Sequence, residues 1–172
     1  MRGNTETNTD AEGSDTEPPV LTASVATTLL QPANSDLVNV GLSASATDNS
    51  GGPVTINVQV FGDEDDETAT SPGVVNSPDA KNIAPGTLRL RAERADSGDG
   101  RVYLIVVKAT DSSGNTSFKT LTVVVPKNPS AASVNSVNTQ ATAARNYADA
   151  NNGAPPPAYF VIGDGAIIGP KQ

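Results

Sequence analysis

The stretch LRLRAERADSGDGRVYLIVVKATDSSGNTSFKTLTVVV, which runs from Leu88 to Val125, decides the fold of this chain. Within it, two apolar runs rich in β-branched residues, at 102–109 and 121–125, flank a polar segment at 111–115. β-Branched side chains fit the pleated, half-buried surface of a sheet, and Asp, Ser, Gly and Asn adopt the conformations that a tight turn needs. The stretch therefore predicts a β-hairpin.

Tyr103 stands near the start of the first run, four residues after Asp99 and two residues before Ile105. This is the spacing of the tyrosine corner in immunoglobulin-like sandwiches, where the tyrosine bonds to upstream backbone and a core residue follows two positions later. Antibody domains place a cysteine at that core position, whereas here Ile105 would fill it by packing alone. We expect Tyr103 to be buried, with its hydroxyl bonded to backbone.

Other segments repeat the period of a strand. Residues 54–61 alternate apolar and polar positions, and in 88–92 the alternation directs Arg89 and Arg91 to solvent. The full set predicts an all-β fold, an immunoglobulin-like antiparallel β-sandwich of about seven strands within residues 20–126. The expected strands are 20–25, 37–46, 54–61, a short one at 74–75, 88–92, 102–109 and 121–125.

The two ends of the chain differ from this central region in composition. Residues 1–19 are polar and acidic, which predicts a tail or linker because they offer too little apolar surface to offset the entropy of ordering. Residues 127–138 also read as a linker, and 139–151 as a short helix capped by Asn138. The remainder, after three consecutive prolines at 155–157, predicts an apolar hairpin arm around a glycine-rich turn at 163–165.

This arm cannot leave its side chains in water, and a lone hairpin is unstable. It therefore docks either on the edge of its own sandwich or on a neighbouring copy, by strand addition. The second interpretation predicts a homo-oligomer, a ring or a filament, linked through the terminal arms. The residues expected at that contact are Tyr159, Phe160, Val161, Ile162, Ile167 and Ile168.

Composition excludes several classes of function. The net charge of −8 makes nucleic acid a poor partner, because an acidic surface repels phosphate. No apolar run approaches the roughly 20 residues that cross a bilayer, so no membrane insertion is expected. The chain has no His and no Cys, and it lacks nucleophile-elbow and phosphate-loop motifs, so we expect no enzyme activity.

Carboxylates are the one group with ionic potential. Calcium takes six to eight oxygen ligands, which sandwich modules can supply from loops gathered at one end. If Asp48 and Asp111 follow two strands that end together, they meet there and a calcium site results. The alternative is a solvated acidic loop, with the turn aspartates bonded to their own turns. The candidate ligands are Asp48, Asp63, Glu64, Asp65, Asp66, Asp79 and Asp111.

The arginine-rich segment allows two interpretations. Arg91, Arg94 and Arg101 could bind a carboxylated or sulfated sugar through forked hydrogen bonds. The favoured interpretation is that these residues pair with Glu93 and with the neighbouring aspartates, the common state of mixed surface charges.

Two turns and one strand resemble a known group of proteins. The segments ATDNSGGPVTI at 46–56, LRAERADSGDGRVY at 90–103 and KATDSSGNTSFKTLTVVVP at 108–126 are similar to hyalin-repeat and related bacterial immunoglobulin-like modules. The resemblance implies a non-catalytic extracellular or cell-surface module, bacterial in origin, used for spacing, adhesion or assembly. The alternative is a carbohydrate-binding module of a secreted protein, which the absence of Trp and the scarcity of other aromatics disfavour.

Overall fold

The computed structural model describes residues 14–69 and 74–171, and the short strand predicted at 74–75 lies at the edge of the described part. The fold is mostly β, with antiparallel sheets and one helix among these residues. The elements are β1 (Val20–Ser24), β2 (Leu37–Asn39), β3 (Ser43–Thr47), β4 (Thr55–Gly62), β5 (Ala80–Lys81), β6 (Arg89–Arg91), β7 (Gly100–Thr110), β8 (Thr116–Pro126), α1 (Ala131–Ala150) and β9 (Phe160–Val161).

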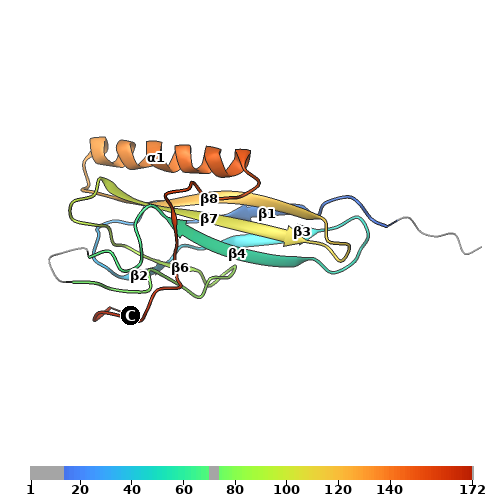
Figure 1. The fold of residues 1–172 in the computed structure, drawn as a ribbon, viewed down its shortest axis with the longest axis horizontal. Helices are drawn as coiled ribbons and strands as arrows, with labels where there is room; N and C mark the ends of the chain where they lie inside the picture. The colour runs from blue at the N-terminus through green and yellow to red at the C-terminus, as the bar shows by residue number, and fades with distance from the viewer. Residues whose placement is uncertain (1–13, 70–73, 172) are drawn as a thin grey trace, which may run out of the picture.

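The hairpin that the sequence predicts is formed by β7 and β8, which are the longest strands (Figure 1). They pair antiparallel from Gly100 opposite Pro126 to Thr110 opposite Thr116. β4 pairs with the other side of β7, and the short β9 pairs with β4, so the sheet has the order β8-β7-β4-β9. This sheet forms one layer of the molecule.

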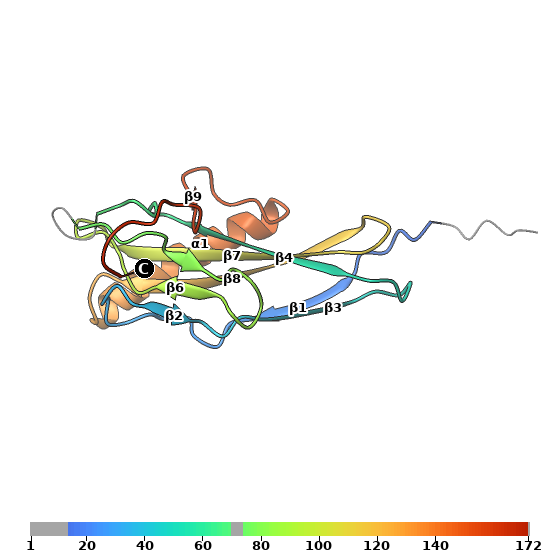
Figure 2. The same cartoon turned by 90° about the horizontal axis from the view of Figure 1, so that it is seen from below.

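The opposite layer combines two smaller sheets, β1-β3 and β2-β6-β5 (Figure 2). β2 and β3 come from the segment predicted as one strand at 37–46, which is interrupted at Gly41. This glycine has a φ of +63°, and a Cβ there would lie 2.8 Å from the Cβ of Ala26. The interruption lets one continuous segment pair with β6 at its start and with β1 at its end.

The core lies between the two layers, where alternate residues of β4, β7 and β8 meet Leu88 and Leu90 from the β6 segment. Tyr103 is fully buried there, and its hydroxyl donates a 2.8 Å hydrogen bond to the carbonyl oxygen of Arg91. This confirms the prediction for Tyr103. The bond joins the two layers, because Tyr103 belongs to β7 and Arg91 to β6.

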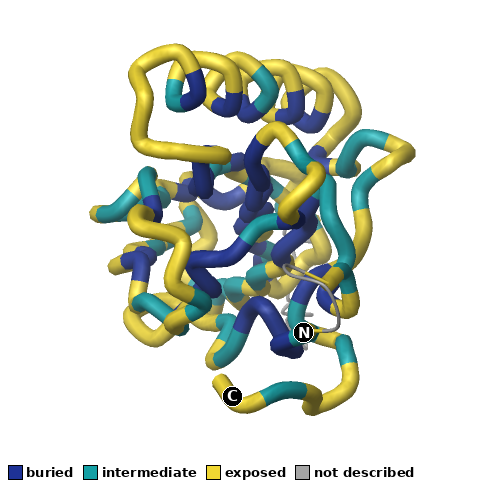
Figure 3. The backbone as a smooth tube through the Cα atoms, turned by 90° about the vertical axis from the view of Figure 1, so that its left-hand side faces the viewer, coloured by how far each residue is buried: buried dark blue, intermediate teal, exposed yellow. Residues whose placement is uncertain are grey.

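Helix α1 covers the outer face of the β7–β8 hairpin (Figures 1 and 3). Small residues on one side of the helix, including Val137 and Ala141, pack against Val102 and Val124. The predicted linker at 127–138 is therefore wrong from Ala131 onward. Ser130, not Asn138, caps the helix, and its Oγ accepts a hydrogen bond from the Ser133 backbone N–H at 3.2 Å.

The segment after the helix is a strap, defined here as residues 154–171, and it does not form the predicted hairpin. It runs from the end of α1 past the edge of β4 to the opposite layer (Figure 1). Phe160 and Val161 pair with β4, and Ile168 pairs with Ser77. The two halves of the arm thus bond to the body of their own chain, because the β4 edge and the 74–79 segment both offer free backbone groups.

Candidate functional site

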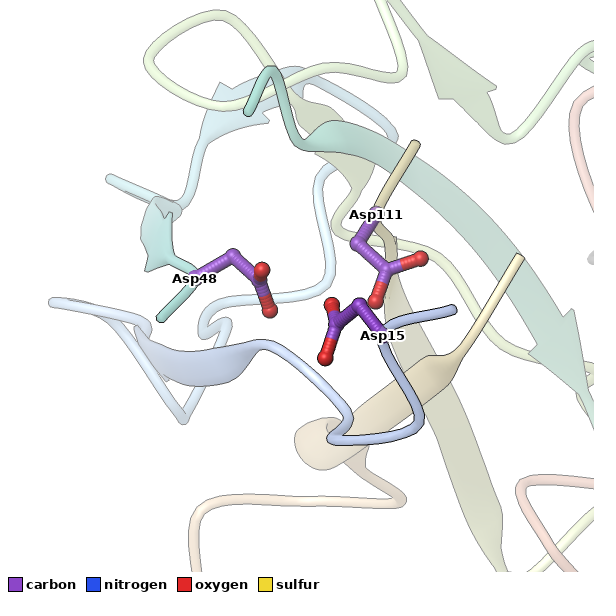
Figure 4. A group of neighbouring side chains, drawn as sticks. All are labelled: Asp15, Asp48 and Asp111. Atoms are coloured by element: carbon purple, nitrogen blue, oxygen red, sulfur yellow. The ribbon is translucent and has the colours of Figure 1, made fainter. Parts of the chain in front are cut away.

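Three aspartates from distant parts of the sequence converge at one end of the molecule (Figure 4). Asp48 follows β3, Asp111 begins the turn between β7 and β8, and Asp15 belongs to the segment that precedes β1. One carboxylate oxygen from each lies within 4.8 Å of one from each of the others. The prediction that Asp48 and Asp111 meet at one end is confirmed, and Asp15 is an addition that the sequence did not reveal.

Asp15 and Asp48 each use one oxygen to hold their own turn, whereas Asp111 uses both. Asp15 Oδ1 accepts the backbone N–H of Glu17 at 3.1 Å, and Asp48 Oδ2 accepts the backbone N–H of Ser50 at 3.0 Å. Asp15 Oδ2 and Asp48 Oδ1 are shielded from solvent and have no hydrogen-bond partner in the described residues. A buried carboxylate oxygen without a partner is costly, so these two atoms are the natural acceptors for a further donor or a cation.

Asp111 is the most deeply covered of the three, with 7% of its surface exposed. Desolvation opposes its charge, but hydrogen bonds from the Asn115 side chain and from turn N–H groups prevail and lower the pKa of its carboxyl. Asn115 also donates to the backbone carbonyl of Asp15 at 3.0 Å, which ties the N-terminal segment to the turn. Asp111 is thus held as an anion beside two other aspartates.

The acidic run at 63–67 lies elsewhere and binds the protein's own donors. Asp63 accepts the Val102 N–H at 2.8 Å, and Glu64 accepts the Arg101 Nε–H at 2.9 Å. Asp66 is fully buried and accepts backbone N–H groups from Gly163 and Gly165 of the strap, at 2.9 and 3.1 Å. Among the described residues, Asp15, Asp48 and Asp111 are the one acidic group with metal-like spacing. The expectation that residues 63–67 and Asp79 share a site with Asp48 and Asp111 is therefore wrong.

The two remaining members of the acidic run also accept backbone N–H groups, one from a neighbour in sequence and one from the strap. Asp65 accepts the backbone N–H of Asp66, and Glu67 accepts that of Ala166 at 3.4 Å. The run is therefore neither a solvated acidic loop nor a set of metal ligands, because its carboxylates accept hydrogen bonds from backbone N–H groups or from an arginine.

Asp79 lies at the centre of a buried ion-pair network. It accepts Arg91 Nε at 2.9 Å and also pairs with Arg101, and all three side chains have 0% exposure. Burial raises the pKa of Asp79 to about 7, with the like charges of Glu93 and Asp66 adding to it, although Arg101 acts in the opposite direction. The prediction that Arg91 points to solvent is wrong, because the strap and the 76–79 segment cover this face of β6.

The favoured interpretation of the arginine-rich segment, internal pairing, is confirmed with different partners. Arg91 and Arg101 pair with Asp79 and Glu64, while Asn76 donates to Glu93 at 2.8 Å. Only Arg94 pairs with a neighbouring aspartate, Asp96, at 3.3 Å. Arg91 and Arg101 are buried and already paired, so neither is available to bind a sugar acid.

The residues predicted for self-association divide into two groups. Ile162 is buried within its own chain, and Tyr159 is half-buried beneath α1. The other four remain exposed to solvent on the strap: Phe160 (45%), Val161 (50%), Ile167 (75%) and Ile168 (39%). The strap thus covers its own sheet edge with backbone and leaves apolar side chains outside.

Comparisons with protein-family models, with curated proteins and with solved structures give no match to this chain. Within the described residues, α1 is not apolar enough to span a membrane.

Proposed function

We propose that this protein is a non-catalytic, immunoglobulin-like structural module of a bacterial surface protein, whose N-terminal segment is clamped to the domain by calcium. The observation that carries the proposal is the convergence of Asp15 on Asp48 and Asp111, with two shielded oxygens left unpaired. A module in a series needs a defined angle to its neighbour. A cation at the point where the chain enters the domain would define that angle.

The strand pairing supports the immunoglobulin-like part of the proposal. Such domains have sheets of order ABED and CFG. With β1 as strand A, the segment β2–β3 as B, β6 as E and β5 as D, the first layer follows that order. β4, β7 and β8 then correspond to C, F and G, and Leu29 adds a parallel bridge to Val124 of β8. The resemblance to hyalin-repeat modules points the same way and suggests an extracellular location.

The donor set fits calcium in its chemistry. All candidate ligands are oxygens, which hard divalent cations prefer, and three carboxylates in such proximity repel one another unless a positive charge compensates them. No described Lys or Arg forms an ion pair with any of the three. A bound Ca²⁺ would supply that charge and would cross-link the segment before β1 to the turns that follow β3 and β7.

Calorimetric titration with CaCl2, after treatment with a chelator, tests the clamp. We expect saturable binding, a rise in Tm with calcium, and slower amide exchange at residues 14–17, because a ligand bound only by the folded state stabilises it. Asp48→Asn should abolish all three effects. The matched control is Asp99→Asn, since Asp99 is an exposed carboxylate that, among the described residues, accepts only from Gln140 at 3.0 Å. Unchanged Tm and amide exchange in millimolar calcium would refute the clamp.

The proposal extends to contacts between modules. The exposed apolar side chains of the strap, such as Phe160 and Ile167, offer a surface on which a neighbouring copy can pack. Light scattering at rising protein concentration should show association that Phe160→Ser and Ile167→Ser weaken together. The matched control is Val20→Ser, an exposed apolar residue on β1 that lies outside the strap. A wild-type protein that stays monomeric at every concentration would exclude this contact.

A further inference from the structure

A groove of about 470 Å³ lies on the outer face of the sheet, beside the segment that follows α1. Its apolar lining includes Phe61, Val106 and Phe118, and its polar lining includes Gln59, Lys108 and Asn152. Small-molecule sites typically measure about 300–1,000 Å³ and combine an apolar surface with a few polar groups. The groove therefore has both the size and the composition of a ligand site.

The register of the strands explains why these side chains meet. Lys108 of β7 lies opposite Phe118 of β8, and Val106 lies opposite Gln59 of β4, so all four point to the same face. The neighbouring wall depends on Gly153, which has a φ of +82°. A Cβ at this position would lie 3.1 Å from a methyl group of Val106, so glycine lets the backbone approach the sheet closely.

Lys108 is the charged residue of this lining, and it is exposed. Within the described part of the chain it forms no ion pair or hydrogen bond, in contrast to Arg91 and Arg101, which the buried network consumes. The side-chain amides of Gln59 and Asn152 are likewise without partners among the described residues. The groove thus presents a free cation and two free amides around an apolar surface.

We propose that this groove binds a pyranose unit that carries one carboxylate, such as a terminal uronic acid. The carboxylate would pair with Lys108, the C–H face of the sugar would lie against Phe118 and Val106, and the amides would bond to ring hydroxyls. The positive charge of Lys108 can attract a carboxylate in the groove although the whole protein is acidic, because charges are screened beyond about 8 Å at physiological ionic strength. The net charge of −8 disfavours long polyanions, so a single acidic sugar fits better than a sulfated polymer.

This inference does not depend on the calcium clamp, since none of the three aspartates lines the groove. It also differs from the sugar site that the arginine-rich segment suggested. There Arg91 and Arg101 are buried, whereas Lys108 is exposed.

Calorimetric titration of the full chain with a matched pair of disaccharides tests the proposal. The probes are glucuronosyl-glucose and the corresponding glucosyl-glucose. We expect the acidic disaccharide to bind at least about tenfold more tightly, and raised salt to weaken its binding. Lys108→Gln should reduce its affinity about tenfold, and Phe118→Ala should reduce it further. Lys119→Gln is the matched control, because it makes the same charge change at an exposed neighbour outside the groove.

Equal affinity for the two disaccharides would overturn the role of Lys108. No binding of either probe up to about 10 mM would overturn the sugar site as a whole. Phe118 is half-buried, so its substitution could disturb the fold. Lys108→Gln alters only an exposed side chain, and amide chemical shifts of residues 106–118 on titration provide a readout in the wild-type protein. Shifts confined to other surfaces would also contradict the assignment.

Discussion

Substituting Tyr103 with Phe removes a hydroxyl that has two partners in the buried network. The hydroxyl donates to Arg91 O at 2.8 Å and accepts from Arg101 Nη1 at 3.1 Å. Neither partner is left alone, because Arg91 O also accepts the Glu93 N–H and Arg101 also pairs with Asp79. The substitution therefore loses only the net stabilisation of the two hydrogen bonds. This is about 1 kcal/mol for the neutral bond to Arg91 O and at least as much for the charged bond from Arg101.

We expect Tyr103→Phe to lower the free energy of unfolding by about 2 kcal/mol, which corresponds to about 4–8 °C in Tm for a domain of this size. Urea denaturation followed by circular dichroism measures this change. Tyr159→Phe is the matched control. Its hydroxyl forms no hydrogen bond within the described residues, and burial raises the pKa of Tyr159, with the nearby Asp63 adding to the effect. If the two variants lost the same stability, the hydrogen bonds of Tyr103 would not be the cause.

Three further predictions concern pH, the strap and the helix. Because folding raises the pKa of Asp63 to about 6 and that of Asp79 to about 7, the folded state binds more protons than the unfolded state. Stability measured in chelator should therefore rise by about 2 kcal/mol per pH unit from pH 7 down to pH 5, and a stability that falls over this range would contradict these shifts. Gly169→Ala should release the strap and speed its proteolysis, because a Cβ at residue 169 would lie 2.0 Å from Val75 O. Gly86→Ala is the control, because Gly86 has a similar φ but no atom within 4 Å of the added Cβ, so it should not change the rate of proteolysis. Val137→Ala should lower the free energy of unfolding, measured by urea denaturation, by about 2 kcal/mol, because Val137 is fully buried. Val134→Ala, at a partly exposed position of the same helix, should lower it by less than about 1 kcal/mol. Equal losses would mean that the packing of the helix does not depend on its buried residues.

The sequence predicted the central hairpin because its signals are local. The polar turn at 111–115 and the β-branched runs beside it needed no knowledge of the rest of the chain. The helix cover was missed, although one signal could have revealed it. Residues 102–107 are apolar at every position, where a half-exposed strand would alternate, so both faces of β7 had to be buried. The covering helix is hard to recognise because its buried stripe consists largely of alanine.

The buried arginines show where strand periodicity fails. Alternation placed Arg91 on the outer face of β6, and it does lie on that face. The outer face is itself covered, because Lys171 of the strap accepts from Arg91 through its backbone carbonyl, 80 positions along the chain. No pattern within a strand contains this information. The presence of a long apolar segment after the domain was the only indication that another surface needed cover.

The candidate metal site was half predictable for the same reason. Asp48 and Asp111 follow β3 and β7, which finish at the same end of the molecule, so the strand topology alone brings them together. Asp15 belongs to a polar segment whose course no periodicity defines. Its position depends on the bond from Asn115 to its carbonyl oxygen, a contact across 100 positions.

The strap also limits how copies of this protein can join. Strand addition to the edge of β4 requires that edge to be free, and β9 already occupies part of it. A tethered segment competes at an effective concentration in the millimolar range, which a second chain at micromolar concentration does not match. Asp66 and Ser77 hold the strap at two further points, so its release would also uncover a buried carboxylate. The association that we propose therefore uses the outward side chains of Phe160 and Ile167, with the strap retained on its own chain.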